Sequence, residues 1–261
     1  MVLENSFNKL IEARHGTILY NKNDIYIGKS IEKYGEFSYL EAKIFEQICK
    51  AGDVVIEVGA NIGAHTLYLS KLVGNGYVFA FEPQRLVFQN LCANLALNSI
   101  SNVFAYQEAV SNENGTIIIP ECNFKENNNF GGINIENTKN GTTVNKQKLD
   151  NFLNKIDRLK LLKIDVEGME ISVIKGASEL IKKFRPMIYV ENDRQEHSKE
   201  LIELLWSLDY KMYWHLPKLY NENNFFNDKE NIFGNIVSVN MFCIHKDLDI
   251  KVIDMVEVLD S

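Results

Sequence analysis

The sequence has 261 residues, of which 46% are hydrophobic, and a formal net charge of −7. This composition provides a full hydrophobic core and excludes a disordered chain, while the negative charge argues against binding of bare nucleic acid as the main activity. No segment approaches the roughly 20 consecutive apolar residues of a membrane span, and the N-terminal residues lack the apolar run of a signal peptide. We therefore expect a cytoplasmic protein without a transmembrane segment.

The first fifty residues predict a hairpin followed by a helix. Residues 17–28 contain two β-rich runs around the turn-forming residues 21–24, which is typical of a hairpin. Apolar residues at helical spacing predict a helix over residues 40–49. We therefore divide the chain into an N-terminal extension over residues 1–50 and a main domain over residues 51–261.

In the main domain, short apolar segments alternate with helical patterns. We expect strands at residues 54–58, 77–81, 103–107, 161–165 and 187–191, late strands at 211–215 and 241–245, and helices at 62–72, 86–97, 168–175 and 197–208. Strands that are apolar on both faces and alternate with helices indicate a parallel sheet covered on both sides. The predicted fold is a doubly wound, mostly parallel, seven-stranded α/β sheet of the Rossmann-like type, with the late strands antiparallel at one edge.

Two segments interrupt this alternation. Residues 121–146 are rich in asparagine and glycine, which predicts a loop or hairpin insertion. Residues 216–235 mix aromatic residues with asparagine. This second segment fits a surface loop with its own small cluster, or a lid or substrate loop, and both interpretations stay open.

The most informative segment is the turn after the first strand of the main domain, VVIEVGANIG. Gly59 permits a tight turn at the carboxyl end of a buried strand, where doubly wound folds bind ligands. The spacing is G-x-x-x-G with Asn61 between the glycines, so it is neither a dinucleotide fingerprint nor a phosphate-binding loop. The turn therefore suits a nucleoside-like ligand without phosphates. Glu57 at its mouth is placed to accept from an ammonium group or to favour a nearby cation.

A second motif supports nucleoside binding. Glu82 ends the strand at 77–81, about twenty residues beyond the glycine turn, where this class of fold places a carboxylate that holds ribose hydroxyls. The alternative role is that of an acid stabilised by the dipole of the following helix, with Pro83 in its first turn. The two roles are compatible.

These motifs carry a family resemblance. The run GDVVIEVGANIGAHTLYLS, the acid of FAFEP and the run LLKIDVEGMEISVIKGA resemble the FkbM-type S-adenosylmethionine-dependent methyltransferases, over about residues 30–195. The resemblance implies methyl transfer from S-adenosyl-L-methionine, usually to a hydroxyl oxygen of a sugar, glycan or secondary metabolite, and Ala109 falls where related methyltransferases place the adenine. The cofactor-binding candidates are Glu36, Glu57, Gly59, Ala60, Asn61, Gly63, Glu82, Pro83, Glu108, Ala109 and Asp165.

The chemistry points to the acids that follow the fourth and fifth strands. Methyl transfer from a sulfonium depends mostly on positioning, and a base helps when the acceptor is a hydroxyl. Asp165 is the first catalytic candidate, with a cap of the following turn as its alternative role; Glu167 is placed to orient the acceptor or cap the helix, and Glu191 is a reserve base. Asp165, Glu191 and Asp193 also have the oxygen ligands that magnesium prefers, but strand-end acids are common in this fold and we assign no metal ligand.

Two other functions are compatible with this class of fold. A nicotinamide-dependent oxidoreductase is disfavoured by Asn61 and by the absence of the third glycine of the dinucleotide pattern. A catalytically inactive binding protein on the methyltransferase fold is disfavoured by the intact glycine turn and by the two acids Glu57 and Glu82.

Overall fold

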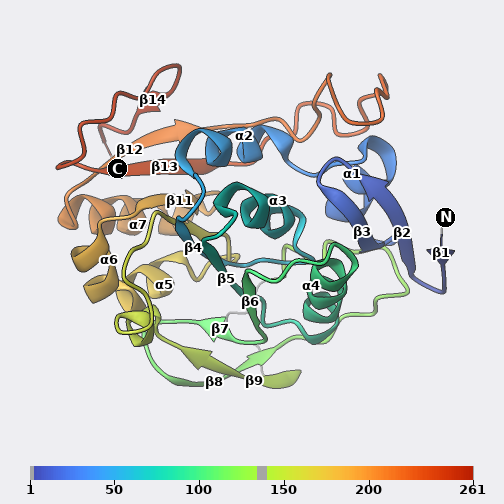
Figure 1. The fold of residues 1–261 in the computed structure, drawn as a ribbon, viewed down its shortest axis with the longest axis horizontal. Helices are drawn as coiled ribbons and strands as arrows, with labels where there is room; N and C mark the ends of the chain where they lie inside the picture. The colour runs from blue at the N-terminus through green and yellow to red at the C-terminus, as the bar shows by residue number, and fades with distance from the viewer. Residues whose placement is uncertain (1–2, 134–139, 261) are drawn as a thin grey trace.

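The computed structural model describes residues 3–133 and 140–260, and its centre is an eight-stranded sheet (Figure 1). The strand order is β14-β12-β13-β11-β10-β4-β5-β6, with the five strands from β11 to β6 parallel and β12, β13 and β14 antiparallel. The bounds are Val54–Val58 for β4, Tyr77–Phe81 for β5, Val103–Tyr106 for β6, Leu161–Ile164 for β10, Met187–Glu191 for β11, Tyr210–His215 for β12, Asn240–His245 for β13 and Val256–Glu257 for β14. The seven predicted strands are confirmed, and the two-residue β14 adds an eighth at the edge.

Helices cover both faces of this sheet, so the fold is doubly wound as predicted. Helices α2, α3 and α4 pack on one face, and α5, α6 and α7 pack on the other (Figure 1). Their bounds are Tyr39–Ile48 for α2, Ala64–Val73 for α3, Arg85–Leu97 for α4, Glu170–Gly176 for α5, Ser178–Phe184 for α6 and Gln195–Ser207 for α7. The chain leaves β4 toward one face and β10 toward the other, and this reversal opens a crevice at the carboxyl ends of the two strands.

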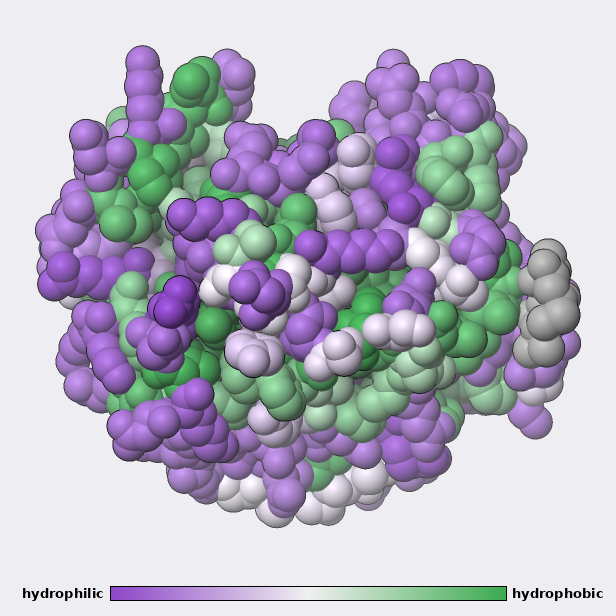
Figure 2. Space-filling view, viewed as in Figure 1, coloured by the Kyte–Doolittle hydropathy of each residue, from purple (hydrophilic) through white to green (hydrophobic). Residues whose placement is uncertain are grey.

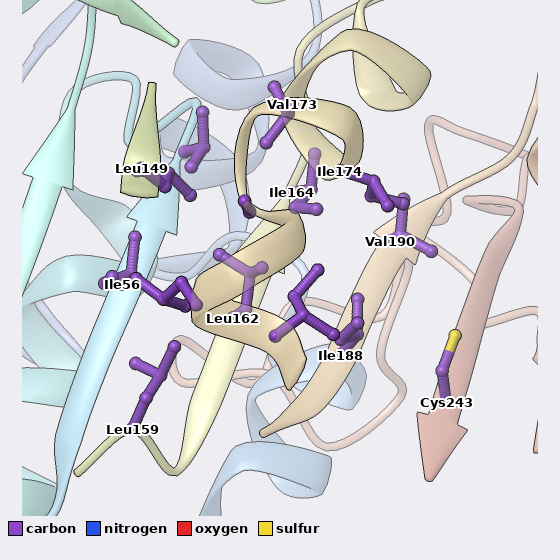
Figure 3. Packing of buried hydrophobic residues seen from close by; sticks show 14 of the residues in the cluster. Ile56, Leu149, Leu159, Leu162, Ile164, Val173, Ile174, Ile188, Val190 and Cys243 are labelled. Carbon is purple, nitrogen blue, oxygen red and sulfur yellow. The ribbon is translucent and has the colours of Figure 1, made fainter. Parts of the chain in front are cut away.

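The core explains why the central strands are apolar throughout. Alternate residues of a strand point to opposite faces, so Ile56 and Val58 face one layer of helices while Val55 faces the other. Figure 3 shows the first layer, where Ile56, Leu162 and Ile188 project from three neighbouring strands toward α5. A strand buried on both sides has no place for a solvated face, and the continuous apolar runs follow from this.

The N-terminal hairpin differs from the prediction. Its strands are β2 (Asn8–Ala13) and β3 (Gly16–Asn21), extended by the short β1 (Leu3–Glu4), and residues 27–34 form helix α1 (Ile27–Tyr34) in place of a second strand. Asp24 is the physical reason, because its Oδ1 accepts the backbone N–H groups of Tyr26 (3.0 Å) and Gly28 (3.1 Å) at the start of α1. The turn-forming residues 21–24 therefore end a strand and begin a helix.

Asn94 of α4 and Asn98, which directly follows this helix, fix the hairpin to the main domain. The Asn94 side chain is fully buried, accepts the backbone N–H of Leu19 (2.6 Å), and donates to the carbonyl oxygens of Leu19 (3.0 Å) and Ile62 (2.8 Å). Asn98 accepts the N–H of Thr17 and donates to its carbonyl oxygen. The hairpin and the segment after Gly59 are thus held by the same amide side chain.

The insertion at 121–146 is flanked by strands that the sequence did not predict. Strands β7 (Ala109–Val110), β8 (Gly115–Ile119) and β9 (Thr142–Gln147) form a small separate sheet, in which β8 and β9 pair as a hairpin, and the short 3-10 helix η1 (Leu149–Phe152) follows. Residues 134–139 of the predicted insertion lie outside the described residues. The part before them turns back to the N-terminal extension, where Asn128 pairs with Asn23 and Ile25 through backbone hydrogen bonds.

The segment at 216–235 contributes to a small aromatic cluster, and its role as a lid or substrate loop stays a prediction. Tyr220 and Phe233 pack against Tyr34 of α1 with ring centroids 5.3 and 5.9 Å away, which makes a small aromatic cluster. Leu219 and residues 236–240 line the cavity described below. No helix in the described part of the chain is long and apolar enough to cross a membrane.

Hydrophilic and hydrophobic residues mix over the face seen in Figure 2. Three of the most exposed apolar side chains, Ile253, Val256 and Leu259, belong to the C-terminal segment.

We expect Gly59→Ala to destabilise the fold strongly. Gly59 has φ +83°, and a Cβ there would lie 1.7 Å from the carbonyl oxygen of Asp165, so the loss should be about 3 kcal/mol or more. Gly234→Ala is the matched control, because Gly234 has φ +58° but no atom within 4 Å of the added Cβ, and should lose about 1 kcal/mol. Urea denaturation measures both, and equal losses would contradict the importance of the β4–β10 contact.

Candidate active site

A cavity of about 480 Å³ opens at the carboxyl ends of β4, β5, β10 and β11. Its wall contains many more acids than bases. The charged residues that line it are Glu41, Glu57, Glu82, Lys163, Asp165, Glu167, Glu191, Asp193 and Arg194. Seven carboxylates therefore face two cations around one cavity, which favours a ligand that carries positive charge.

The glycine turn forms one wall of this cavity and is held by β5. The backbone N–H groups of Gly59 (3.0 Å) and Ala60 (2.9 Å) both donate to the carbonyl oxygen of Phe81. Asn61 follows in the left-handed region with φ +51°, and Gly63, with φ +87°, precedes the first turn of α3. Gly59 is needed for its close approach to the Asp165 backbone, a constraint within the protein that the sequence analysis did not anticipate.

Glu82 lies beside this turn and is 3% exposed. Its carboxylate accepts the backbone N–H groups of Asn61 (3.0 Å) and Gln84 (2.8 Å), so it fixes the turn and the start of α4 together. Burial raises the pKa of Glu82 to about 7. Because the side chain also lines the cavity, the structural role and a ligand-binding role are available to the same carboxylate.

A smaller pocket continues from the main cavity and contains the remaining cofactor candidates. Pro83, Glu108 and Ala109 line it together with Val166 and Met169. Gly59, Glu82, Asp165 and Glu167 line both spaces, so the two pockets are contiguous. A single ligand can therefore place a flat group in the smaller pocket and extend into the main cavity.

Lys163 occupies the centre of the charged wall, and the sequence analysis did not single it out. Its side chain is 3% exposed, and Nζ lies 3.2 Å from Asp165 Oδ2 and 3.8 Å from Glu57 Oε1. Burial lowers the pKa of Lys163, but the negative charges of Asp165, Glu57 and Glu41 together raise it by more, so the net shift of the pKa is upward. A lysine in the apolar run LLKID is the signal that identifies this position, because a charge within a buried strand requires partners.

Glu57 and Thr66 complete this cluster. Glu57 is 1% exposed and accepts a hydrogen bond of 2.6 Å from Thr66 Oγ1. Burial raises the pKa of Glu57 to about 7, although Lys163 opposes the shift. Near neutral pH this carboxyl group is therefore poised between its charged and neutral forms.

The segment before β4 brings Glu41 to the cavity, whereas Glu36 lies elsewhere. Glu41 is 5% exposed, lines the cavity and accepts a hydrogen bond of 2.6 Å from Ser38 Oγ. Glu36 is held by Arg14 Nε (2.6 Å), by Asn221 Nδ2 (2.8 Å) and by the backbone N–H of Phe225 (2.9 Å), and it is not among the cavity-lining residues. Its contacts connect the hairpin to the segment at 216–235, so the structure places Glu41 at the cavity and Glu36 outside it.

The catalytic candidates Asp165, Glu167 and Glu191 converge in one part of the cavity wall, which we call its acidic end. One carboxylate oxygen from each lies within 4.8 Å of the others. Glu167 pairs with Arg194 at 2.8 Å. Burial, followed by the nearby Asp165, raises the pKa of Glu167 to about 7 and raises the pKa of Glu191 well above its ordinary value.

Glu170, the first residue of α5, holds the turn that precedes this helix. Its Oε1 accepts the backbone N–H groups of Val166 and Gly168, both at 3.2 Å. The side chains of Asp165 and Glu167 are therefore available to face the cavity. The wall of the cavity also contains residues of the first predicted insertion, Leu219 of the second, and three residues that follow the second: Asn129, Gly131, Gly132, Leu219, Ile236, Val237 and Ser238.

Comparisons with known proteins agree with this geometry. The family model described as the methyltransferase FkbM domain matches residues 57–212, more than half of the chain. Methyltransferase sdnD of Sordaria araneosa is 27% identical over 55% of this chain and 70% of its own length. The hexuronic acid methyltransferase AglP of Haloferax volcanii is 26% identical over 66% of this chain and 69% of its own.

A solved structure of an FkbM methyltransferase from Methylobacillus flagellatus has a TM-score of 0.47 and 17% identity, over 78% of this chain. This chain covers 50% of the length of that protein.

The fold and the site define a methyltransferase with a Rossmann-like sheet. The family match contains the glycine turn, Glu82 and the run IDVEGME, which are the elements that build the cavity. The chain belongs to the FkbM methyltransferase family.

Replacement of the buried lysine should destabilise the protein in a pH-dependent way. Lys163→Met leaves Glu57 and Asp165 without their buried counter-ion, so we expect a loss of about 3–5 kcal/mol at pH 8. The pKa of Glu57 is raised to about 7, so in the folded protein this group is ionised at pH 8 and protonated at pH 5.5. The loss should therefore be smaller at pH 5.5, where Glu57 is protonated.

Chemical denaturation at both pH values measures this effect. The double variant Lys163→Met/Glu57→Gln is the control, and it should recover part of the stability at pH 8. A loss that is the same at both pH values and in the double variant would show that the lysine acts through packing alone.

Proposed function

We propose that this protein transfers a methyl group from S-adenosyl-L-methionine to a hydroxyl oxygen of a sugar, glycan or secondary metabolite. The observation that carries the proposal is the position of Glu82, a buried carboxylate beside the glycine turn that lines both the main cavity and the smaller pocket. Two vicinal hydroxyls of a ribose need such an acceptor between a base-binding pocket and a reaction chamber.

The residues around the cavity fit the chemical groups of this cofactor. Glu82 would accept from the ribose hydroxyls, while Pro83, Glu108 and Ala109 would flank the adenine. Gly59, Ala60, Asn61 and Gly63 form the turn against which the ligand packs, and Glu57 and Glu41 offer carboxylates to an ammonium group. When bound, the cofactor supplies a methyl group that is already activated on a positively charged sulfur.

The acidic end of the cavity would receive the acceptor. A hydroxyl must lose its proton as its oxygen takes up the methyl group. Asp165 would hold the acceptor hydroxyl, Glu167 would orient it with the help of Arg194, and Glu191, whose raised pKa makes it a stronger base when ionised, would take the proton. The relative named as a hexuronic acid methyltransferase supports an acceptor that contains a sugar.

Calorimetry with S-adenosylhomocysteine and with NAD⁺ tests the cofactor directly. We expect saturable binding of S-adenosylhomocysteine and none of NAD⁺, and the reverse would favour an oxidoreductase. A screen of sugar and glycan acceptors with a labelled methyl donor then identifies the product. Absence of binding to S-adenosylhomocysteine would refute the proposal before any acceptor is known.

Glu82 should make cofactor binding depend on pH. The free protein holds a proton on Glu82 below about pH 7, whereas the ribose hydroxyls need the carboxylate. Affinity for S-adenosylhomocysteine should therefore fall as the pH drops below 7, by up to about tenfold per unit. Glu82→Gln should weaken binding by about tenfold or more at pH 8 and flatten this dependence. Calorimetry between pH 5.5 and pH 8 measures both, and wild-type affinity in the variant would leave Glu82 with only its backbone contacts.

Asp165 should act in the transfer step more than in folding. Asp165→Asn keeps the size of the side chain but removes its charge, so we expect turnover to fall by about 10²-fold or more. The dissociation constant for S-adenosylhomocysteine should change far less than turnover does. The melting temperature should fall only partly, because Lys163 loses its nearest charged partner but keeps Glu57. Asp150→Asn is the matched control, because Asp150 accepts the N–H of Leu180 away from the cavity and asparagine caps about as well. Near-normal turnover of Asp165→Asn would remove Asp165 from the mechanism.

A further inference from the structure

The three carboxylates at the acceptor end have the spacing of ligands around one metal ion. Oxygens from Asp165, Glu167 and Glu191 lie within 4.8 Å of one another at the carboxyl ends of β10 and β11. Hard divalent cations bind carboxylate oxygens at about 2.0–2.6 Å, so two ligands of the same ion lie up to about 5 Å apart. A single ion can therefore touch all three side chains.

A second observation, outside this acidic cluster, also indicates a ligand. Asn240 is 4% exposed, lines the same cavity and pairs directly with Glu191 across β11 and β13. Side chains of directly paired residues lie on the same side of a sheet. Within the described residues, neither Nδ2 of Asn240 nor Oε2 of Glu191 has a hydrogen-bond partner, although both atoms are buried. A buried amide donor that faces a cavity is satisfied by an acceptor oxygen of a ligand or of a water molecule.

The charges around the cluster leave room for one more cation. Lys163 contacts Asp165 through Oδ2, and Arg194 contacts Glu167 through Oε2, so each base engages one oxygen of its partner. Glu191 has no ion pair among the described contacts. Asp193 adds a further carboxylate to the same part of the wall. Oxygen ligands without sulfur or nitrogen donors select magnesium, calcium or manganese over zinc or copper.

We propose that Asp165, Glu167 and Glu191 bind one hard divalent cation of the magnesium or calcium class beside the acceptor. The oxygen of the acceptor hydroxyl, which loses its proton beside this ion, accepts the hydrogen bond of Asn240 Nδ2. The occupant is a metal rather than an ammonium group of the acceptor, because an ammonium group brings no acceptor oxygen to Asn240. With the ion bound, Glu191 would hold it through one carboxylate oxygen and take the proton of the acceptor through the other. The role of the ion toward the acceptor rests on the proposed function, but the binding of the ion does not.

Manganese is a suitable probe because it binds oxygen sites and is paramagnetic. We expect the wild-type protein to bind one equivalent of Mn²⁺, measured by electron paramagnetic resonance and calorimetry, with Mg²⁺ and Ca²⁺ competing. Glu191→Gln should weaken Mn²⁺ binding by about tenfold or more, whereas its affinity for S-adenosylhomocysteine should stay within about threefold. Glu203→Gln, at an exposed carboxylate on α7, is the matched control and should bind Mn²⁺ as the wild type does.

Several results would overturn the metal site. They are the absence of saturable Mn²⁺ binding at millimolar concentration, equal Mn²⁺ affinity in Glu191→Gln, or saturable binding of glucosamine in a protein that binds no Mn²⁺. Binding of S-adenosylhomocysteine serves as the folding check for each variant, and Asp165→Asn replaces Glu191→Gln if that variant does not fold. Failure to bind S-adenosylhomocysteine tests the methyltransferase proposal, and failure to bind Mn²⁺ tests only the metal site.

Discussion

Contact between Gly59 and the backbone carbonyl of Asp165 sets the geometry of the whole site. A side chain at residue 59 would overlap that oxygen, with its Cβ 1.7 Å away, so only glycine lets the ends of β4 and β10 lie so close. The parallel register places Glu57 beside Lys163 in the same two strands. Because both strands end together, the glycine turn, the buried charges and Asp165 share one cavity.

The charges in this cavity are held at a cost to stability. Glu57 and Glu82 are almost fully buried, and burial raises the pKa of each to about 7. Hydrogen bonds from Thr66 to Glu57 and from Asn61 to Glu82 offset part of this penalty. A protein gains nothing in folding from such an excess of buried acids. The arrangement is instead suited to a ligand that brings positive charge and hydroxyl donors.

Segments far from the glycine turn in sequence complete the same cavity. The segment over residues 129–132 contributes Asn129, Gly131 and Gly132, and the strand β13 contributes Asn240. Glu36 does not line the cavity but, through Arg14 and Asn221, it ties the hairpin to the segment that precedes β13. The N-terminal extension thus contacts the segment at 216–235 through Glu36, while Glu41 reaches the cavity directly.

The sequence by itself determined the central sheet, because strands buried on both faces must be apolar throughout and the helices between them must be amphipathic. It also identified Gly59, Glu82 and Asp165, since strand ends in such a sheet share one edge. The hairpin was misplaced by several residues because Asn21 and Asp24 favour both a turn and a helix start, and only the hydrogen bonds from Tyr26 and Gly28 to Asp24 decide between them. Strand register decides the ion pairs of Lys163 and the pairing of Asn240 with Glu191. Contacts between distant segments decide that Glu41, and not Glu36, lines the cavity. No local pattern in the sequence encodes either.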